Sequence, residues 1–230
     1  MNLLRRLAVG GPTRVLVLAA CLALAACGDD SPAATPAATG TATSAVPSVA
    51  EPDLREELLA MFAEDQAVRT GVAPPGDDRT PQELLASMDE VDARHAARLA
   101  EILDAYGWPG WSLVGRDGST AAWALVQHAD VRPALQRRAL ELLRKAVEAG
   151  DASPGDLAYL TDRVRVADGE PQVYGTQWET DASGSLVPRT PIEDPEHVDE
   201  RRAAAGLQPL EQYLDELREV LTGPPASATG

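Results

Sequence analysis

The chain has 230 residues, of which 20 are Lys or Arg and 36 are Asp or Glu, giving a formal net charge of −16 at pH 7. This charge repels phosphate backbones and anionic headgroups, so we expect no nucleic-acid partner. The hydrophobic fraction of 44% and the charged fraction of 24% are ordinary for a globular protein. The length suffices for one domain with appendages.

The N-terminus predicts export. Residues 1–14 carry three arginines, and residues 15–26 form an apolar run that ends in Leu-Ala-Ala directly before Cys27. The run is shorter than the ~20 residues of a transmembrane helix, so the pattern indicates a signal peptide over residues 1–26. The Leu-Ala-Ala-Cys ending resembles the bacterial lipobox, which implies cleavage before Cys27 and lipidation of its thiol. The alternative is an ordinary signal peptide with an incidental cysteine.

Cysteine usage agrees with this interpretation. The only other cysteine, Cys21, would leave with the signal peptide. The mature chain would then have no thiol for a disulfide, a metal site or a nucleophile. We therefore expect an extracytoplasmic protein of the bacterial cell envelope that contacts the membrane through palmitate or a related lipid on Cys27.

Composition divides the rest of the chain into three parts. Residues 27–52 are the lipidated cysteine and an Ala, Pro, Thr and Ser tether, too poor in large apolar side chains to fold. Residues 53–221 carry the periodic patterns of a folded domain. Residues 222–230 read as a second disordered segment.

The first predicted helix covers residues 53–70. Its apolar stripe consists of Leu54, Leu58, Met61 and Phe62. Asp65 and Arg69 continue the same face four residues apart, so they can pair. Either the stripe ends there and both side chains reach water, or they form an inward ion pair at the rim of a pocket.

The second predicted helix begins after the Thr80 cap, with Glu83 completing a capping box, and runs to about Tyr106. Asp92 and His95 lie within its apolar stripe, three residues apart and on the same face. Two buried polar side chains must bond to each other or to something bound. A structural Asp–His pair and a functional pair both remain open.

A turn-rich connection over residues 107–118 follows and contains Trp108. Ser119 is the expected cap of a helix that carries Gln127 and ends near His128. Because His128 and Asp130 lack the i, i+4 spacing of a helical metal motif, they are not predicted as paired ligands. Asp130 either caps the next helix or belongs to a site.

The next helix covers residues 131–149, with Gln136 on its apolar stripe and therefore hydrogen-bonded inside. A short helix should open at Ser153-Pro154 and end near Arg163, after Asp162, and extended pieces should follow. The remaining predicted elements are extended segments at 164–166 and 172–174, strands at 172–179 and 185–189, a helix capped by Asp194-Pro195 up to about Ala205, and a last helix at 210–221. The fold class is mainly α, a single helical domain with a small β-hairpin near residues 164–190.

Several strings then match a known pattern in order. They are Asp65-Gln66 with Arg69, Gly107-Trp108-Pro109, Val114-Gly115, Gln127-His128-Ala129-Asp130, Gln136, Asp162-Arg163, Gln172-x-Tyr174-Gly175-Thr176-Gln177, Val198-Asp199-x-x-Arg202 and Gly206-Leu207. In this the chain resembles the bacterial domain family of unknown function 6624 over about residues 53–215. The resemblance brings no activity, but it implies that the polar strings belong to one site.

The candidate residues suit recognition better than bond making, because amides predominate and no nucleophile stands out. The candidates for catalysis are His128, Asp130, Asp162 and Arg163, and those for ligand binding are Asp65, Arg69, Asp92, His95, Trp108, Gln127, Gln136, Gln172, Tyr174 and Gln177. Carboxylates and imidazoles can bind metals, but no spacing selects a metal site. The cofactor and the ligand or protein partner are undetermined.

Three functions are compatible with this pattern. The leading one is a lipoprotein whose domain binds a small polar ligand or a partner. The first alternative is a hydrolase that uses His128 as acid or base. The second is a structural protein in which the polar side chains form a buried hydrogen-bond network.

Overall fold

A computed structural model describes residues 49–222, and the predicted signal peptide, most of the tether and the C-terminal segment lie outside them. The described chain is mainly α, as predicted. Its elements are α1 (Pro52–Thr70), α2 (Pro81–Ala86), α3 (Met88–Tyr106), α4 (Trp111–Gln127), α5 (Pro133–Glu148), α6 (Pro154–Ala167), β1 (Trp178–Thr180), β2 (Leu186–Pro188), the 3-10 helix η1 (Pro195–His197), α7 (Val198–Ala204) and α8 (Leu210–Thr222). None of the helices in this part of the chain has the length and apolar character needed to span a bilayer.

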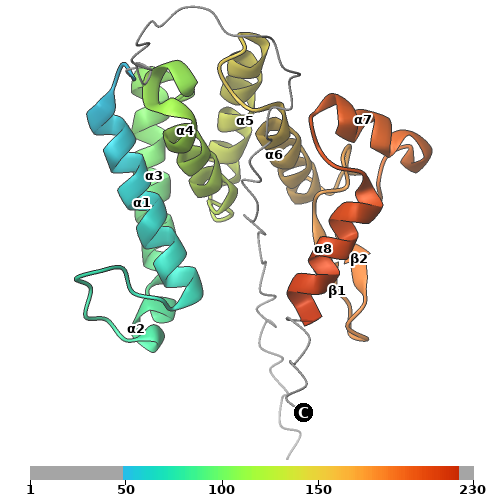
Figure 1. The fold of residues 1–230 in the computed structure, drawn as a ribbon, viewed down its shortest axis with the longest axis horizontal. Coiled ribbons are helices and arrows are strands. Elements are labelled where there is room, and N and C mark those ends of the chain that lie inside the picture. Colours follow the sequence, from blue (N-terminus) through green and yellow to red (C-terminus); the bar gives the residue numbers. More distant parts are fainter. Residues whose placement is uncertain (1–48, 223–230) are drawn as a thin grey trace, which may run out of the picture.

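Helices α1, α3 and α4 stand side by side at one end of the molecule, and the hairpin with α7 and α8 forms the other end (Figure 1). Helices α5 and α6 lie between them. The main core fills the space among α1, α3, α4, α5 and α6 and includes the fully buried Leu58, Leu99, Val126 and Leu143. Burial of apolar area of this kind is the main stabilising contribution in a domain without disulfides.

The chain enters the domain through ordered backbone. The amides of Ala50 and Glu51 donate to the carbonyls of Ser112 and Leu113 at the start of α4. The tether predicted up to residue 52 is therefore wrong for its last residues, because the start of α4 offers them hydrogen-bond partners. Helix α1 then spans Pro52–Thr70, and Gly71 caps it with a left-handed φ of 69°.

The single helix predicted from Thr80 to Tyr106 is wrong in one respect, since it breaks at Ser87 into α2 and α3. The predicted capping box is present: the Thr80 side chain accepts from the Glu83 amide, and the Glu83 carboxylate accepts from the Thr80 amide. The Ser87 hydroxyl donates to the Leu84 carbonyl at the break. Such a bond competes with helix continuation and favours a bend.

The connection predicted over residues 107–118 is also wrong, because α4 already begins at Trp111. Gly115 has a φ of 74° and kinks the helix there, and only glycine adopts such an angle without strain. Ser119 does not cap a helix. It lies in the helix interior, buried, and its hydroxyl accepts from the Trp108 indole.

Helix α6 extends to Ala167, so the extended segment predicted at residues 164–166 is wrong. The helix opens at Ser153-Pro154 as predicted, with the Ser153 side chain accepting from the Asp156 amide. Packing of Val164 against the main core overrides the β preference of the Val-Arg-Val string. The helix ends at Asp168 and Gly169.

The C-terminal end of the domain is built on the hairpin. Strands β1 and β2 pair antiparallel with Trp178 opposite Pro188, and they are shorter than predicted. Residues 172–174 form no strand, although Gln172 makes an isolated parallel bridge to Ile192. Apolar side chains of α8 cover the hairpin with Tyr213, Leu214 and Leu217 buried. Edge-on ring contacts join Trp123 to Tyr159 and Tyr159 to Tyr213, so α4, α6 and α8 share one aromatic column.

Candidate functional site

Four polar side chains from three helices meet where α1 and α4 end, and we call them the His128 cluster: Asp65 and Arg69 of α1, Asp92 of α3, and His128 after α4. Asp65 lies 2.9 Å from His128 Nδ1, and Arg69 Nε donates to Asp65 at 3.0 Å. Arg69 also donates to Asp92 at 2.6 Å. Asp65 is 1% exposed, so Asp65 and Arg69 form the inward ion pair rather than a frayed helix end.

The His128 ring is oriented through one nitrogen. Both Asp65 oxygens and the Arg69 Nε lie 2.9 Å from Nδ1, which cannot donate and accept at once. We assign the proton to Nδ1, because a lone pair there would face a buried carboxylate while Arg69 already has carboxylate acceptors. The described residues make no hydrogen bond to Nε2. A buried carboxylate thus orients the imidazole and leaves the far nitrogen for another group.

The two carboxyl groups of the cluster, Asp65 and Asp92, have pKa values shifted in opposite directions. Burial favours the neutral acid, but the hydrogen bond from His128 and the charge of Arg69 hold the pKa of Asp65 below its usual value. At Asp92, burial raises the pKa against the opposing charge of Arg69. Asp92 has 15% of its side chain exposed and Arg69 has 23%, so the outer side of the cluster reaches solvent.

Asp92 and His95 do not pair with each other, which corrects both readings of that motif. Asp92 turns to Arg69, and His95 Nε2 lies 3.2 Å from Glu64. Burial lowers the pKa of His95, which is 4% exposed, against the raising effect of Glu64. The neighbours Glu64 and Asp65 therefore each face one histidine, and His95 stands beside the His128 cluster rather than within it.

A second set, the Asp130 cluster, lies on the other side of the turn after α4. Arg163 of α6 donates from Nε and Nη2 to the two oxygens of Asp130, at 2.9 and 2.6 Å. Gln136 donates to Asp130 at 3.1 Å and also to the carbonyls of Val126 and Gln127. Asp130 is therefore not the cap of α5, because the bidentate Arg163 pair fixes it elsewhere.

The Asp130 pair is asymmetric in exposure. Arg163 has 7% of its side chain exposed and Asp130 has 56%, so the buried guanidinium forms its ion pair with a carboxylate at the surface. Burial opposes ionisation, yet the hydrogen bond and charge of Arg163 lower the pKa of Asp130. Arg163 also donates to the Gln177 amide oxygen at 3.3 Å. The cluster joins α5, α6 and the segment before β1, and each nitrogen of the Arg163 guanidinium donates to a side chain within it.

Asp162 is fully buried and is satisfied by the protein itself. Its carboxylate accepts from the backbone amides of Val173, Tyr174 and Thr176 and from the Thr176 hydroxyl, at 2.6 to 3.2 Å. A carboxylate with this many donors shapes a loop and needs no ligand. Asp162 therefore holds the 173–176 loop, which favours a structural role for this residue among the catalytic candidates.

Three further candidates, Trp108, Gln127 and Gln172, are buried and contact other parts of the protein. Trp108 is 7% exposed and belongs to the main core. Gln172 is fully buried and bonds the backbone of Gln177 and Thr190. The Gln127 amide oxygen accepts from the Trp123 indole and the Leu160 amide in the orientation that satisfies both groups. Internal contacts of this kind favour a structural role for these three residues.

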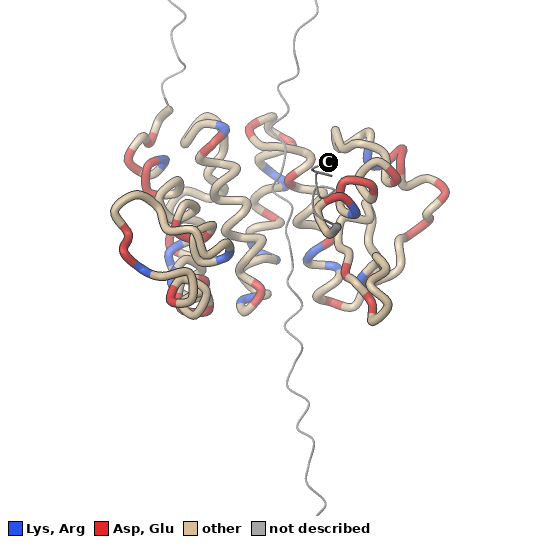
Figure 2. Tube along the Cα trace, turned by 60° about the horizontal axis from the view of Figure 1, so that its bottom comes forward, with Lys and Arg blue, Asp and Glu red and all other residues tan. Residues whose placement is uncertain are grey.

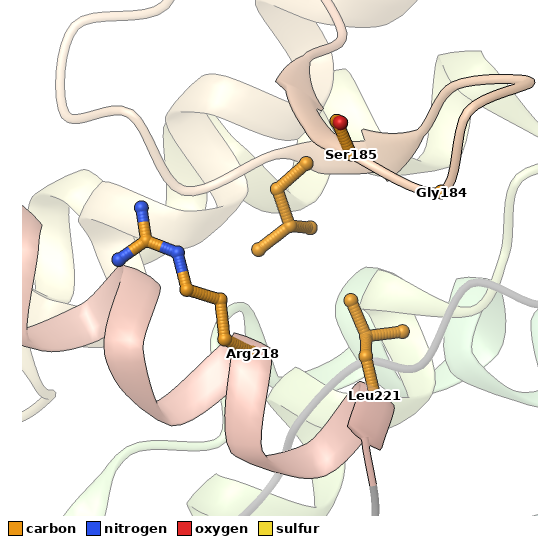
Figure 3. A pocket seen from close by; sticks show the side chains of 5 residues that line it. Gly184, Ser185, Arg218 and Leu221 are labelled. Carbon is orange, nitrogen blue, oxygen red and sulfur yellow. The ribbon is translucent and has the colours of Figure 1, made fainter.

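A surface depression within residues 49–222 is lined by none of the residues of the His128 and Asp130 clusters. It measures about 320 Å³ and is lined by Gly184, Ser185, Leu186, Arg218 and Leu221, between the hairpin turn and the end of α8 (Figure 3). Within the same part of the chain, no three His, Asp or Glu side chains are grouped to hold a metal. Basic positions are scattered among acidic ones in the view of Figure 2.

Sequence reasoning missed several partners. Glu64 on His95 and Met88, whose sulfur accepts from Arg69 at 3.4 Å, lie off the motifs that were singled out. Arg202 appeared only within a motif string, yet it is 1% exposed and donates to the carbonyls of Tyr174 and Gln208. A charged residue at an apolar position of a short helix is the one signal that could have identified it.

Comparison with known proteins identifies the family of the chain but no biochemical activity. A family model described as a family of unknown function, DUF6624, matches residues 52–222, which covers every helix from α1 to α8. No curated protein matches the chain, and no solved structure does. The chain therefore belongs to DUF6624, a family of unknown function.

Proposed function

We propose that this chain is an extracytoplasmic lipoprotein whose helical domain binds a small polar ligand at the His128 cluster. The anchor part of the proposal rests on the basic start, the short apolar run and the Leu-Ala-Ala-Cys27 ending. Each buried CH₂ of an attached lipid contributes ~0.8 kcal/mol, so a multi-chain anchor holds the protein on the membrane.

The anchor is tested with the two cysteines of the chain. Cells producing the wild type, Cys27→Ala or Cys21→Ala receive labelled palmitate, and the label and membrane fraction are measured. We expect Cys27→Ala to lose both label and membrane association and Cys21→Ala to keep both. Equal membrane association of Cys27→Ala and wild type would contradict the proposal.

The binding part rests on one observation, the Asp65–His128 contact that leaves Nε2 without a partner among the described residues. In the tautomer assigned above, Nε2 accepts a hydrogen bond, so the ligand presents an O–H or N–H group. Arg69 and Asp92 at the partly exposed side add a donor and an acceptor. These groups favour a polar ligand such as a sugar, an amino alcohol or a cell-wall fragment.

The same observation supports a second candidate, a hydrolase in which His128 acts as acid or base. A histidine whose Nδ1 bonds a buried carboxylate is the arrangement that general bases use, with Nε2 facing the reacting group. Arg69 could stabilise developing negative charge beside it. Among the described residues, no Ser, Thr or Cys side chain hydrogen-bonds to the cluster, so this hydrolase would activate water.

A thermal-shift screen with sugars, amino alcohols, nucleotides, metals and cell-wall fragments tests these ideas on the full chain in mild detergent. A binding compound should raise the melting temperature of the wild type but not of His128→Gln, while His197→Gln serves as the control imidazole. A hydrolase would also convert the compound, which mass spectrometry detects. Equal stabilisation of wild type and His128→Gln would contradict a His128 site and favour a structural role for the cluster.

A further inference from the structure

The peptide bond between Asp194 and Pro195 is chemically unusual in this chain. It is the only Asp-Pro bond in the sequence. Asp194 has a φ of 42° and is the one non-glycine residue with positive φ among the described residues. Non-glycine residues with such strained backbone angles concentrate at functional sites. An aspartyl carboxyl can close a five-membered ring on its own carbonyl carbon, and proline nitrogen is a good leaving group.

The carbonyl oxygen of this bond accepts two hydrogen bonds. The His197 amide donates at 3.2 Å and the Arg201 Nη2 donates at 3.0 Å. Arg201 is fixed for this task, because its Nε donates to the Val173 carbonyl at 2.8 Å and its Nη2 also bonds the Glu193 carbonyl. One backbone donor and one cation on a carbonyl oxygen stabilise the oxyanion that forms when its carbon is attacked.

The Asp194 side chain is held close to the same groups. Its Oδ2 lies 2.9 Å from His197 Nδ1 and 4.0 Å from Arg201 Nη1. The hydrogen bond to Asp194 raises the pKa of His197, which favours an imidazolium beside the bond. The other charged groups that face this site are Glu193, bonded to Arg165, and Glu200, whose charge acts on His197. The Asp194 side chain is 56% exposed, so water reaches it.

We propose that the folded chain cleaves itself between Asp194 and Pro195. The Asp194 carboxylate oxygen bonds to its own main-chain carbonyl carbon, and the resulting oxyanion lies against Arg201 and the His197 amide. The C–N bond breaks, and the Pro195 nitrogen takes a proton from the His197 imidazolium. Water then opens the cyclic anhydride to two carboxylates and returns protons to His197 and to the new Pro195 amine. The net reaction is hydrolysis of one peptide bond.

The fold predicts the fate of the two pieces. Helix α8 buries Tyr213, Leu214 and Leu217 against the hairpin, and Arg202 bonds the Tyr174 carbonyl across the cut. The segment that begins at Pro195 should therefore stay bound after cleavage. Cleavage should be visible in a denaturing gel and invisible in native size-exclusion chromatography.

The experiment incubates the full chain in mild detergent at about pH 5 to 8 and follows the mass of both pieces over days. We expect a new N-terminus at Pro195 and a rate at least about tenfold higher than in the same chain unfolded in urea. The Glu51-Pro52 and Glu170-Pro171 bonds are internal controls and should stay intact. Equal rates in folded and unfolded chain would overturn the proposal, because free Asp-Pro bonds also hydrolyse slowly.

Four variants separate the roles, each first checked for the wild-type far-UV spectrum and melting temperature. Asp194→Asn should abolish cleavage, and Pro195→Ala should slow it because an ordinary amide nitrogen leaves less readily. Arg201→Met should slow it at least about tenfold by removing one oxyanion donor. His197→Gln keeps the backbone donor and should reduce the rate only where His197 would be protonated. A folded Arg201→Met or Asp194→Asn variant that is cut at the wild-type rate would overturn the mechanism.

Discussion

Asp162 and Arg202 hold opposite sides of the same residue, Tyr174. The Asp162 carboxylate accepts from the Tyr174 amide at 3.1 Å, and Arg202 Nη1 donates to the Tyr174 carbonyl at 2.8 Å. Both side chains are buried, at 0% and 1% exposed. At these contacts the Asp162 carboxylate and the Arg202 guanidinium bond to the backbone and not to an opposite charge. Backbone dipoles of the loop, which lies between the two side chains, therefore compensate both charges. The result is a loop whose backbone is fixed from α6 and from α7.

Replacement of Asp162 by Asn tests this clamp. The Asn NH₂ group would face amide or hydroxyl donors in either orientation, because donors approach both carboxylate oxygens. We expect the free energy of unfolding to fall by roughly 2 to 4 kcal/mol, measured by urea denaturation. The control is Asp168→Asn on the same helix, an exposed partner of Arg137. An Asp162→Asn midpoint as high as that of the control would contradict the clamp.

The tautomer of His128 is a second testable point. Histidine ¹⁵N spectra resolve the ring nitrogens, and the three histidines of the chain can be assigned by single substitutions. We expect the proton on Nδ1 in the wild type, because Asp65 accepts from it, and a shift toward the Nε2 tautomer in Asp65→Asn. His197, which is bonded to Asp194 elsewhere, should be unaffected. An Nε2 proton in the wild type would show that Arg69 donates to Nδ1 instead.

The sequence predicts the helices well, because their apolar stripes are long and their caps have clear chemistry. Thr80 with Glu83 and Ser153 with Pro154 are examples that the structure confirms. The predictions failed where tertiary packing overrides local preference. The Val164 segment continues a helix, and α4 runs through Gly115 at the cost of a kink.

The polar residues of the candidate site were identifiable as misplaced charges on apolar stripes, but their partners were not. Periodicity places Asp65 and Arg69 on an inner face, and this is what the structure has. Periodicity does not show which residue of another helix lies opposite, so it offers Asp92 only its neighbour His95 or a bound group, whereas Asp92 bonds Arg69 of α1. Long-range pairs such as Asp130 with Arg163 depend on how helices dock, which no local pattern encodes.

The kink of α4 gives a third prediction. Gly115 has a backbone φ of 74°. A Cβ added at this residue would lie 3.2 Å from Val49 Cγ1 and 3.1 Å from the Asp117 carboxylate. We expect Gly115→Ala to lower the free energy of unfolding by about 1 to 3 kcal/mol. Gly150 has a φ of 71° with nothing within 4 Å, so Gly150→Ala measures the backbone strain alone. Equal losses in both variants would mean that contact with the incoming chain contributes nothing.

Asp156 gives the last prediction, a dependence of stability on pH. It follows the Ser153 cap in the first turn of α6, and burial raises its pKa to about 7, against the opposing hydrogen bond from Ser153. Because the folded pKa lies above the unfolded one, the folded state binds the proton more tightly. The stabilisation is complete below about pH 4 and is lost as the pH rises through about 7.

Asp156→Asn removes this dependence. We expect its free energy of unfolding, relative to wild type, to rise by roughly 2 to 4 kcal/mol between about pH 4 and pH 8. Urea denaturation at both pH values measures the difference. At the other end of α6, the hydrogen bond from Arg137 lowers the pKa of Asp168, so Asp168→Asn should be less stable than wild type at both pH values, and this difference should shrink only below about pH 4. A pH-independent difference for Asp156→Asn would show that the Asp156 carboxyl stays ionised and hydrated in the folded protein.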